Sequence, residues 1–123
     1  MKFYICRHCG NLVHMIKDVG VPIVCCGQKM EELKANTVEA SGEKHIPVAK
    51  LENGVLNVNV GSVDHPMLPE HYIEWVVLET EKGSQIAYLK PEDKPNVSFC
   101  IGEDKPVAVY AYCNLHGLWK AEL

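Results

Sequence analysis

The stretch Asn53-Gly54-Val55-Leu56-Asn57-Val58-Asn59-Val60 decides the fold class of this 123-residue chain. Asn-Gly strongly favours a tight β-hairpin turn, because both residues tolerate the positive φ angles that such a turn requires. After this pair, apolar and polar residues alternate with the period of two that is typical of a half-buried strand. The stretch therefore predicts a β-hairpin with one face against a core.

Further extended segments follow at similar spacing, separated by Gly, Asn, Asp and Pro. We predict strands at residues 72–80, 85–90, 97–101 and 107–113. Two packed sheets are the simplest closure for such segments, so residues 37–123 are expected to form a β-sandwich. The only candidate helix is short, at residues 30–34, and residues 34–42 are the expected connector. The expected fold class is all-β.

Residues 1–36 are expected to form a separate, much smaller domain. Their apolar stretches are short and are interrupted by cysteine-glycine pairs, so they offer little material for a core. A segment of this length needs a metal, disulfides or a partner to offset its chain entropy. The cysteines are the candidates for that role.

Four cysteines of the first domain have the spacing of a metal site. Cys6-Arg7-His8-Cys9-Gly10 is a turn in which two thiolates can face one metal, and Cys25-Cys26-Gly27 supplies two more. Four sulfurs predict a tetrahedral zinc or iron centre. The adjacent pair predicts some distortion, since neighbouring strand residues point to opposite faces and can share a metal only from a turn. His8 and His14 are interpreted as surface residues, because four thiolates fill the coordination shell.

A second cluster is expected in the sandwich. Cys113-Asn114-Leu115-His116-Gly117 repeats the first turn with an imidazole in place of a thiolate, and three other histidines of this domain are His45, His65 and His71. Together they offer four nitrogens and one sulfur, a set that suits iron, copper, nickel or zinc. Five ligands leave one octahedral position free for a small molecule, which is a feature of catalytic sites. Trp119 follows the turn closely enough to shield it, and the apolar run around Cys100 predicts a core position.

The bulk composition excludes several classes of function. The net charge is −4 and no run of Lys and Arg offers a stripe for phosphates, so no nucleic-acid partner is expected. Apolar residues make up 47% of the chain and charged residues 23%, without a long apolar segment, so no membrane span is expected. No export signal is recognisable at the N-terminus, and a cytoplasmic location is therefore expected.

These motifs resemble the desulfoferrodoxin family, the two-iron form of superoxide reductase, over essentially the whole chain. The resemblance rests on the two cysteine pairs, on Glu43-Lys44-His45-Ile46-Pro47, on His65-Pro66 followed by His71, and on the Cys113–Gly117 turn. It implies two iron ions per chain. The first would be a distorted four-cysteine centre in a desulforedoxin-like domain, held by Cys6, Cys9, Cys25 and Cys26. The second would be the catalytic iron in an immunoglobulin-like sandwich, with His45, His65, His71 and His116 around it and Cys113 as axial ligand.

The resemblance also implies an activity and partners. Ferrous iron at the second site would reduce superoxide by one electron to hydrogen peroxide, and a donor such as rubredoxin would reduce the iron again. Lys44 would attract the anionic substrate, and Glu43 would occupy the open position of the oxidised iron. Family members with two centres are homodimers, so a homodimer is expected. From the residues alone, Glu43 and Lys44 form an ordinary charged turn.

Two other interpretations compete with the enzyme. A β-sandwich with a Cys-x-x-His turn could be a copper electron-transfer protein, but that site uses two histidines and a weak axial ligand. Alternatively, both metals could be structural zinc in a scaffold protein. Colour combined with metal analysis separates these alternatives, because zinc proteins are colourless and ferric thiolate sites absorb visible light.

Overall fold

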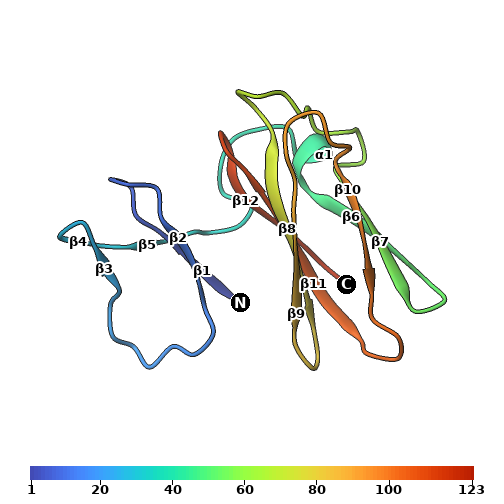
Figure 1. Cartoon of the computed structure of the whole chain (residues 1–123), viewed down its shortest axis with the longest axis horizontal. Coiled ribbons are helices and arrows are strands. Elements are labelled where there is room, and N and C mark those ends of the chain that lie inside the picture. Colours follow the sequence, from blue (N-terminus) through green and yellow to red (C-terminus); the bar gives the residue numbers. More distant parts are fainter. The chain divides into compact units, whose positions relative to one another are not determined.

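The computed structural model describes all 123 residues, and the chain divides into two compact units, Met1–Lys34 and Ala35–Leu123. Both units consist of strands and turns apart from one four-residue helix (Figure 1). The all-β class expected from the sequence is confirmed. No helix of the chain has the length and apolar character needed to cross a membrane.

The first unit contains two small sheets. Strands β1 (Lys2–Ile5), β2 (Leu12–Met15) and β5 (Glu31–Glu32) form one sheet in the order β2-β1-β5, and β3 (Val24–Cys25) pairs with β4 (Gln28–Lys29). The helix predicted at residues 30–34 was wrong. Glu31 and Glu32 pair with Ile5 and Tyr4 of β1 instead, because five residues are too few for a stable isolated helix.

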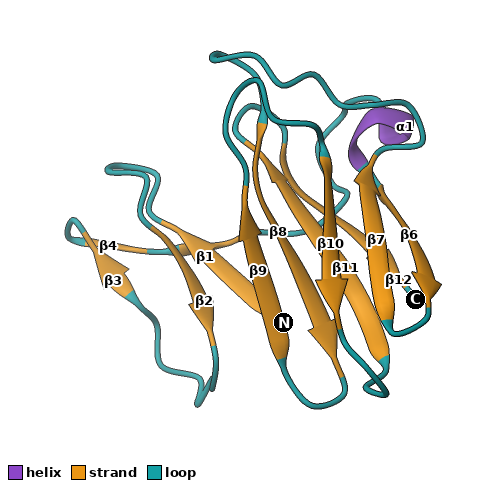
Figure 2. Ribbon diagram, turned by 45° about the vertical axis from the view of Figure 1, so that its right-hand side comes forward, coloured by secondary structure: helices purple, strands orange, loops and turns teal.

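The second unit is a sandwich of two antiparallel sheets (Figure 2). The three-stranded sheet has the order β10-β7-β6 and consists of β6 (Pro47–Glu52), β7 (Val55–Val60) and β10 (Asn96–Cys100). The four-stranded sheet has the order β12-β11-β8-β9 and consists of β8 (Ile73–Thr80), β9 (Ser84–Tyr88), β11 (Pro106–Cys113) and β12 (Gly117–Glu122). One turn of helix, α1 (Gly42–His45), precedes β6.

The hairpin predicted around Asn53-Gly54 joins β6 to β7. Asn53 has a φ of 51° and Gly54 a φ of 75°, and Glu52 pairs with Val55. Positive φ angles at both central residues are those of a type I′ turn, whose twist suits a two-residue hairpin. This turn fixes the register, so Leu56, Val58 and Val60 all face the core, with at most 2% of each residue exposed.

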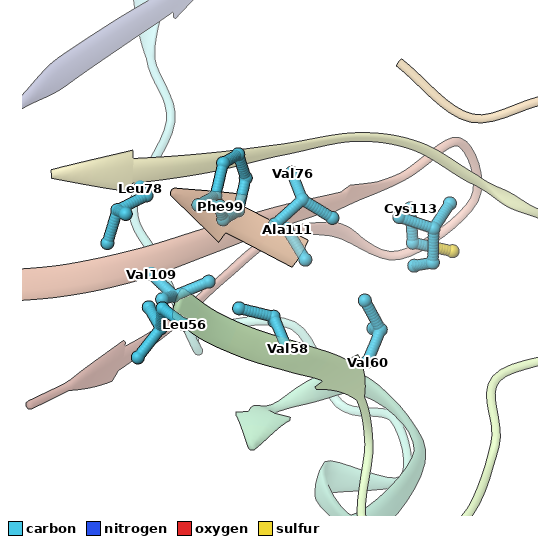
Figure 3. Close-up of a cluster of buried hydrophobic side chains, with 10 residues drawn as sticks. Leu56, Val58, Val60, Val76, Leu78, Phe99, Val109, Ala111 and Cys113 are labelled. Atoms are coloured by element: carbon cyan, nitrogen blue, oxygen red, sulfur yellow. The ribbon is translucent and has the colours of Figure 1, made fainter. Parts of the chain in front are cut away.

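The core lies between the two sheets and ends at Cys113. Figure 3 shows side chains from β7, β8, β10 and β11 meeting there, and Cys113 is fully buried at the end of β11. The interpretation of Cys100 as a core residue was wrong, since its side chain is exposed. In β10 it is Val97 and Phe99 that face inwards, and the alternation turns Ser98 and Cys100 outwards.

Candidate metal centres

The four cysteine sulfurs of the first unit lie within 4.8 Å of one another. The Sγ atoms of Cys9 and Cys25 are 3.6 Å apart, and those of Cys25 and Cys26 are 4.0 Å apart. None of these cysteines forms a disulfide. Sulfurs bound tetrahedrally at about 2.3 Å from one metal would be about 3.8 Å apart, so the spacing fits a four-sulfur metal centre.

A tight hairpin allows the adjacent cysteines to face the same point. Cys25 is the last residue of β3 and pairs with Gln28, which leaves Cys26 and Gly27 as the turn. Their φ angles are 52° and 72°, a conformation that glycine adopts freely and that a cysteine adopts only when its surroundings require it. Cys26 thereby leaves the strand, and its sulfur is no longer directed away from that of Cys25.

Nearby donors and repulsion between sulfurs set the pKa values in this cluster. The backbone N–H of Cys9 donates to Sγ of Cys6 at 3.5 Å, and this bond is the main cause that lowers the pKa of Cys6 to about 6. Hydrogen bonds with the neighbouring sulfurs, that of Cys9 first, raise the pKa of Cys26 to about 12. Without a cation, the neighbouring sulfurs therefore suppress ionisation of Cys25 and Cys26. A bound cation would remove that penalty.

The second cluster lies at one end of the sandwich. His45 ends α1, His65 and His71 belong to the loop between β7 and β8, Cys113 ends β11, and His116 lies in the turn before β12. In antiparallel sheets the end of one strand adjoins the start of its partner. The starts of β6, β8 and β12 therefore meet the ends of β7 and β11 at this edge (Figure 1).

The nitrogen atoms of this cluster have the separations of ligands around one ion. Nε2 of His45 lies 3.1 Å from Nε2 of His65 and 3.2 Å from Nδ1 of His116. Nitrogens bound at right angles about 2.1 Å from a metal would be about 3.0 Å apart. The ligand atoms of His45, His65, His71 and Cys113 all lie within 4.8 Å of one another, and Sγ of Cys113 is 3.8 Å from Nδ1 of His116.

The tautomers of two histidines leave their Nε2 atoms available to a cation. Nδ1 of His45 lies 2.7 Å from the carbonyl oxygen of Ser41, and Nδ1 of His65 lies 2.7 Å from that of Pro66. Each Nδ1 therefore carries the proton and donates it, as metal-bound histidines usually do. The two Nε2 atoms then face each other with lone pairs, an arrangement that a metal ion would stabilise.

Burial keeps these imidazoles neutral and ready to bind a metal. It is the main cause that lowers the pKa of His45 and His71, and it lowers the pKa of His65 to about 4. Nε2 of His71 is buried and has no hydrogen-bond partner. Burial also raises the pKa of the Cys113 thiol, while the backbone N–H of His116 donates to its sulfur at 3.4 Å. Neutral imidazoles with one thiol, which a bound metal would deprotonate, fit a transition metal such as iron.

Glu43 and Lys44 are exposed on α1, immediately before His45. The carbonyl of Glu43 accepts hydrogen bonds from the backbone N–H of Val63 at 2.9 Å and from Oγ of Ser62 at 3.3 Å. The charge of Lys44 adds to the effect of burial in lowering the pKa of His45 and His71. Lys44 is therefore close enough to this cluster to affect its electrostatics.

Supporting groups around the second cluster are harder to find in the sequence. The ring of Trp119 stacks on His45 at 4.8 Å between centroids, and its Nε1–H donates to the carbonyl of His116 at 3.1 Å. The carbonyls of Ser41 and Pro66 that orient His45 and His65 leave no signal in the sequence, since every residue has one. The sequence presents Asn114 only as part of the Cys113–Gly117 turn, whereas in the structure its side chain bonds to the loop that carries His71.

The fold and the two clusters define a two-centre non-haem metalloprotein, with a four-sulfur site and a site of four nitrogens and one sulfur. A sequence model described as Desulfoferrodoxin matches residues 37–122. The desulfoferrodoxin of Nitratidesulfovibrio vulgaris is 46% identical over 121 residues, which cover 98% of this chain and 95% of that protein. The chain belongs to the desulfoferrodoxin family, and its two clusters fit two iron centres.

Two solved structures extend the comparison. The superoxide reductase from Treponema pallidum is 37% identical, with a TM-score of 0.82 and coverage of 98% of both chains. The superoxide reductase described as 1Fe-SOR from Giardia intestinalis is 30% identical, with a TM-score of 0.55, and covers 66% of this chain and 99% of its own. The Giardia protein thus matches only about two thirds of this chain.

Proposed function

We propose that this chain is a superoxide reductase, which converts superoxide to hydrogen peroxide by adding one electron and two protons. The observation that carries the proposal is the convergence of imidazole nitrogens from three parts of the chain beside the buried thiol of Cys113. The similarity to the superoxide reductases from Treponema pallidum and Giardia intestinalis supports it. A structural zinc site would need fewer ligands, since such sites are four-coordinate.

Iron would be held at this site by His45, His65, His71, His116 and Cys113. When bound in the ferrous state, it supplies the electron and leaves one coordination position for a small anion. The protein contributes the neutral tautomers of His45 and His65, which the carbonyls of Ser41 and Pro66 fix in advance. Backbone N–H donation to Sγ of Cys113 limits the charge on the thiolate.

We assign Lys44 and Glu43 to the open side of the site. Superoxide is an anion and the protein carries a net charge of −4, so a local positive charge is needed to attract the substrate. Nζ of Lys44 would donate hydrogen bonds to the incoming anion and to the water that delivers its protons. The carboxylate of Glu43 would close the site after the product has left.

The remaining parts of the proposal concern the whole chain. Residues 1–36 would form the desulforedoxin-like domain and residues 37–123 the catalytic domain, with the four-cysteine iron as an accessory or relay centre. A small rubredoxin-like protein would supply electrons, and the chain would act as a homodimer in the cytoplasm. Six free cysteines suit such a reducing compartment.

The test is an anaerobic pulse of superoxide on the fully reduced protein, with peroxide and dioxygen counted. We expect one peroxide for each superoxide consumed and no dioxygen, because the protein supplies the electron. Equal amounts of peroxide and dioxygen would indicate a dismutase and contradict the proposal. Iron analysis of the same sample shows whether both centres were loaded.

A further inference from the structure

Asn114 connects the turn that carries Cys113 and His116 to the loop that carries His71. Its Oδ1 accepts a hydrogen bond from the backbone N–H of Tyr72 at 3.0 Å, and its Nδ2 donates to the carbonyl of Glu70 at 3.0 Å. Its own backbone N–H donates to the carbonyl of Tyr72 at 3.2 Å. Asn114 therefore binds the backbone on both sides of His71.

His71 is the histidine of the cluster that most needs such support. The rings of His45 and His65 are oriented by hydrogen bonds from Nδ1 to carbonyl oxygens, and that of His45 also stacks on Trp119. The buried Nε2 of His71 has no hydrogen-bond partner, and its ring meets the rings of His65 and His116 edge-on. Its position therefore depends strongly on its backbone. That backbone is held by the bridge to Leu68 within the same loop, by Asn114, and by Ile73, which pairs with Cys113 where β8 begins.

We infer that Asn114 is a positioning residue that holds His71 against the other ligands of the second centre. This inference rests on the proposed function, because it treats His71 as an iron ligand. The bridge to Leu68 shapes the loop but does not connect it to the ligand turn. The side chain of Asn114 adds two hydrogen bonds to the connection that its own backbone N–H and the Ile73–Cys113 pair make, and one of them reaches Glu70 on the far side of His71. Without these two bonds the pairing at Tyr72 and Ile73 would remain, and Glu70 and His71 could shift away from the Cys113–His116 pair.

The chain offers a matched control in Asn36. Its Nδ2 donates to the carbonyl of Lys120 at 3.1 Å, and its Oδ1 accepts from the backbone N–H of Lys120 at 2.9 Å. Asn36→Ala therefore removes the same two kinds of hydrogen bond from the same unit without touching the loop of His71. Because the φ of Asn36 is 61°, alanine there also adds backbone strain, which lowers the melting temperature further and does not reach the loop of His71. Asn114→Ala and Asn36→Ala are prepared as full-length protein, each with and without His71→Ala.

Three quantities are measured on these proteins. They are the melting temperature of the metal-free form, the affinity of the second centre for iron by competition with a chelator, and its ferric thiolate absorption. We expect both asparagine variants to lower the melting temperature. Only Asn114→Ala should weaken iron binding about 10- to 100-fold, as is typical when a group that orients a ligand is lost, and shift the absorption.

Iron affinity measured in the His71→Ala background tests whether Asn114 acts through His71. If Asn114 works through His71, Asn114→Ala weakens iron binding no further once His71 is absent, because the two losses share one cause. Additive losses, or an Asn114→Ala protein that binds iron like Asn36→Ala, would overturn the inference. Should Asn114→Ala not fold, Asn114→Asp is tested by the same criterion, since it keeps an acceptor for Tyr72. Failure of the unmodified protein to bind iron at this centre would instead overturn the proposed function, and this inference with it.

Discussion

Lys44 is the residue that we propose attracts the anionic substrate to the second centre. Lys44→Ala should slow capture of superoxide about tenfold, near the lower end of electrostatic steering effects, and should weaken the dependence of the rate on ionic strength. Iron content should stay unchanged, because Lys44 is not among the proposed ligands. Pulse radiolysis at several salt concentrations measures both effects.

Lys105→Ala is the matched control for this charge. Lys105 is exposed and immediately precedes β11, whose other end carries Cys113, so it lies at the opposite end of the sandwich. Its removal changes the net charge by the same amount and should leave the capture rate nearly unchanged. Equal rates for the two variants would remove the steering role of Lys44.

The buried histidines predict how the metal-free protein responds to pH. The pKa of His65 is about 4 in the folded protein, against an ordinary value of 6.5, and burial shifts His45 and His71 in the same direction. Between these pH values the unfolded chain binds protons that the folded chain does not. The free energy of unfolding should therefore be greatest above pH 6.5 and fall as the pH decreases towards 4. Urea titrations of the apoprotein measure it, and stability that rises on acidification would contradict the prediction.

At the scale of elements, Gly61 allows the loop after β7 to pack against α1. Its φ is +88°, and a Cβ there would lie 2.4 Å from the carbonyl oxygen of Val63 and 2.7 Å from that of Glu43. Gly61→Ala should lower the free energy of unfolding by about 1–3 kcal/mol through backbone strain. It should also weaken iron binding, because α1 carries His45.

Gly83→Ala is the control for that substitution. A Cβ at Gly83 meets nothing within 4 Å, and its φ does not lie in the left-handed region. Replacement there should be neutral or stabilising by about 0.4–1 kcal/mol, because alanine restricts the unfolded chain. Denaturant unfolding of both variants gives the comparison. A Gly61→Ala protein as stable as Gly83→Ala would show that the contact between α1 and the loop is loose.

Elements with local sequence signals could be predicted, whereas contacts that depend on strand order could not. Asn53-Gly54 and the alternation after it are local signals, and they predicted the hairpin and the strand β7. The bounds of the other strand of this hairpin, β6, were not predicted, because apolar and polar residues do not alternate along Pro47–Glu52, where Val48 and Leu51 are about half exposed. The Cys113–His116 turn was readable because its residues are neighbours. By contrast, the convergence of His45, His65 and His71 depends on strand order, which their spacing does not encode. They were grouped with this turn because they lie in the same domain, and the family resemblance supplied the role of each.

At the scale of the whole molecule, the two units depend on different sources of stability. The first unit buries five apolar residues, counting Cys6 among them: Phe3, Ile5, Cys6, Met30 and Leu33. Chains shorter than about 40 residues usually need a metal or disulfides to fold, and this unit has 34 residues. The sandwich has a continuous core of ten buried residues between its sheets. Metal loss should therefore unfold the first unit and leave the sandwich folded.

Replacing Cys9 and Cys25 together by serine tests this independence. The double variant should lose the absorption of the four-sulfur centre, and residues 1–34 should become sensitive to protease. The second centre should keep its iron and its reaction with superoxide, because its ligands all lie in the sandwich. Cys113→Ser is the reciprocal variant, which should lose only the thiolate absorption of the second centre. Loss of both absorptions in either variant would mean that the two centres fold as one unit, because independent domains cannot transmit the loss of one metal to the other.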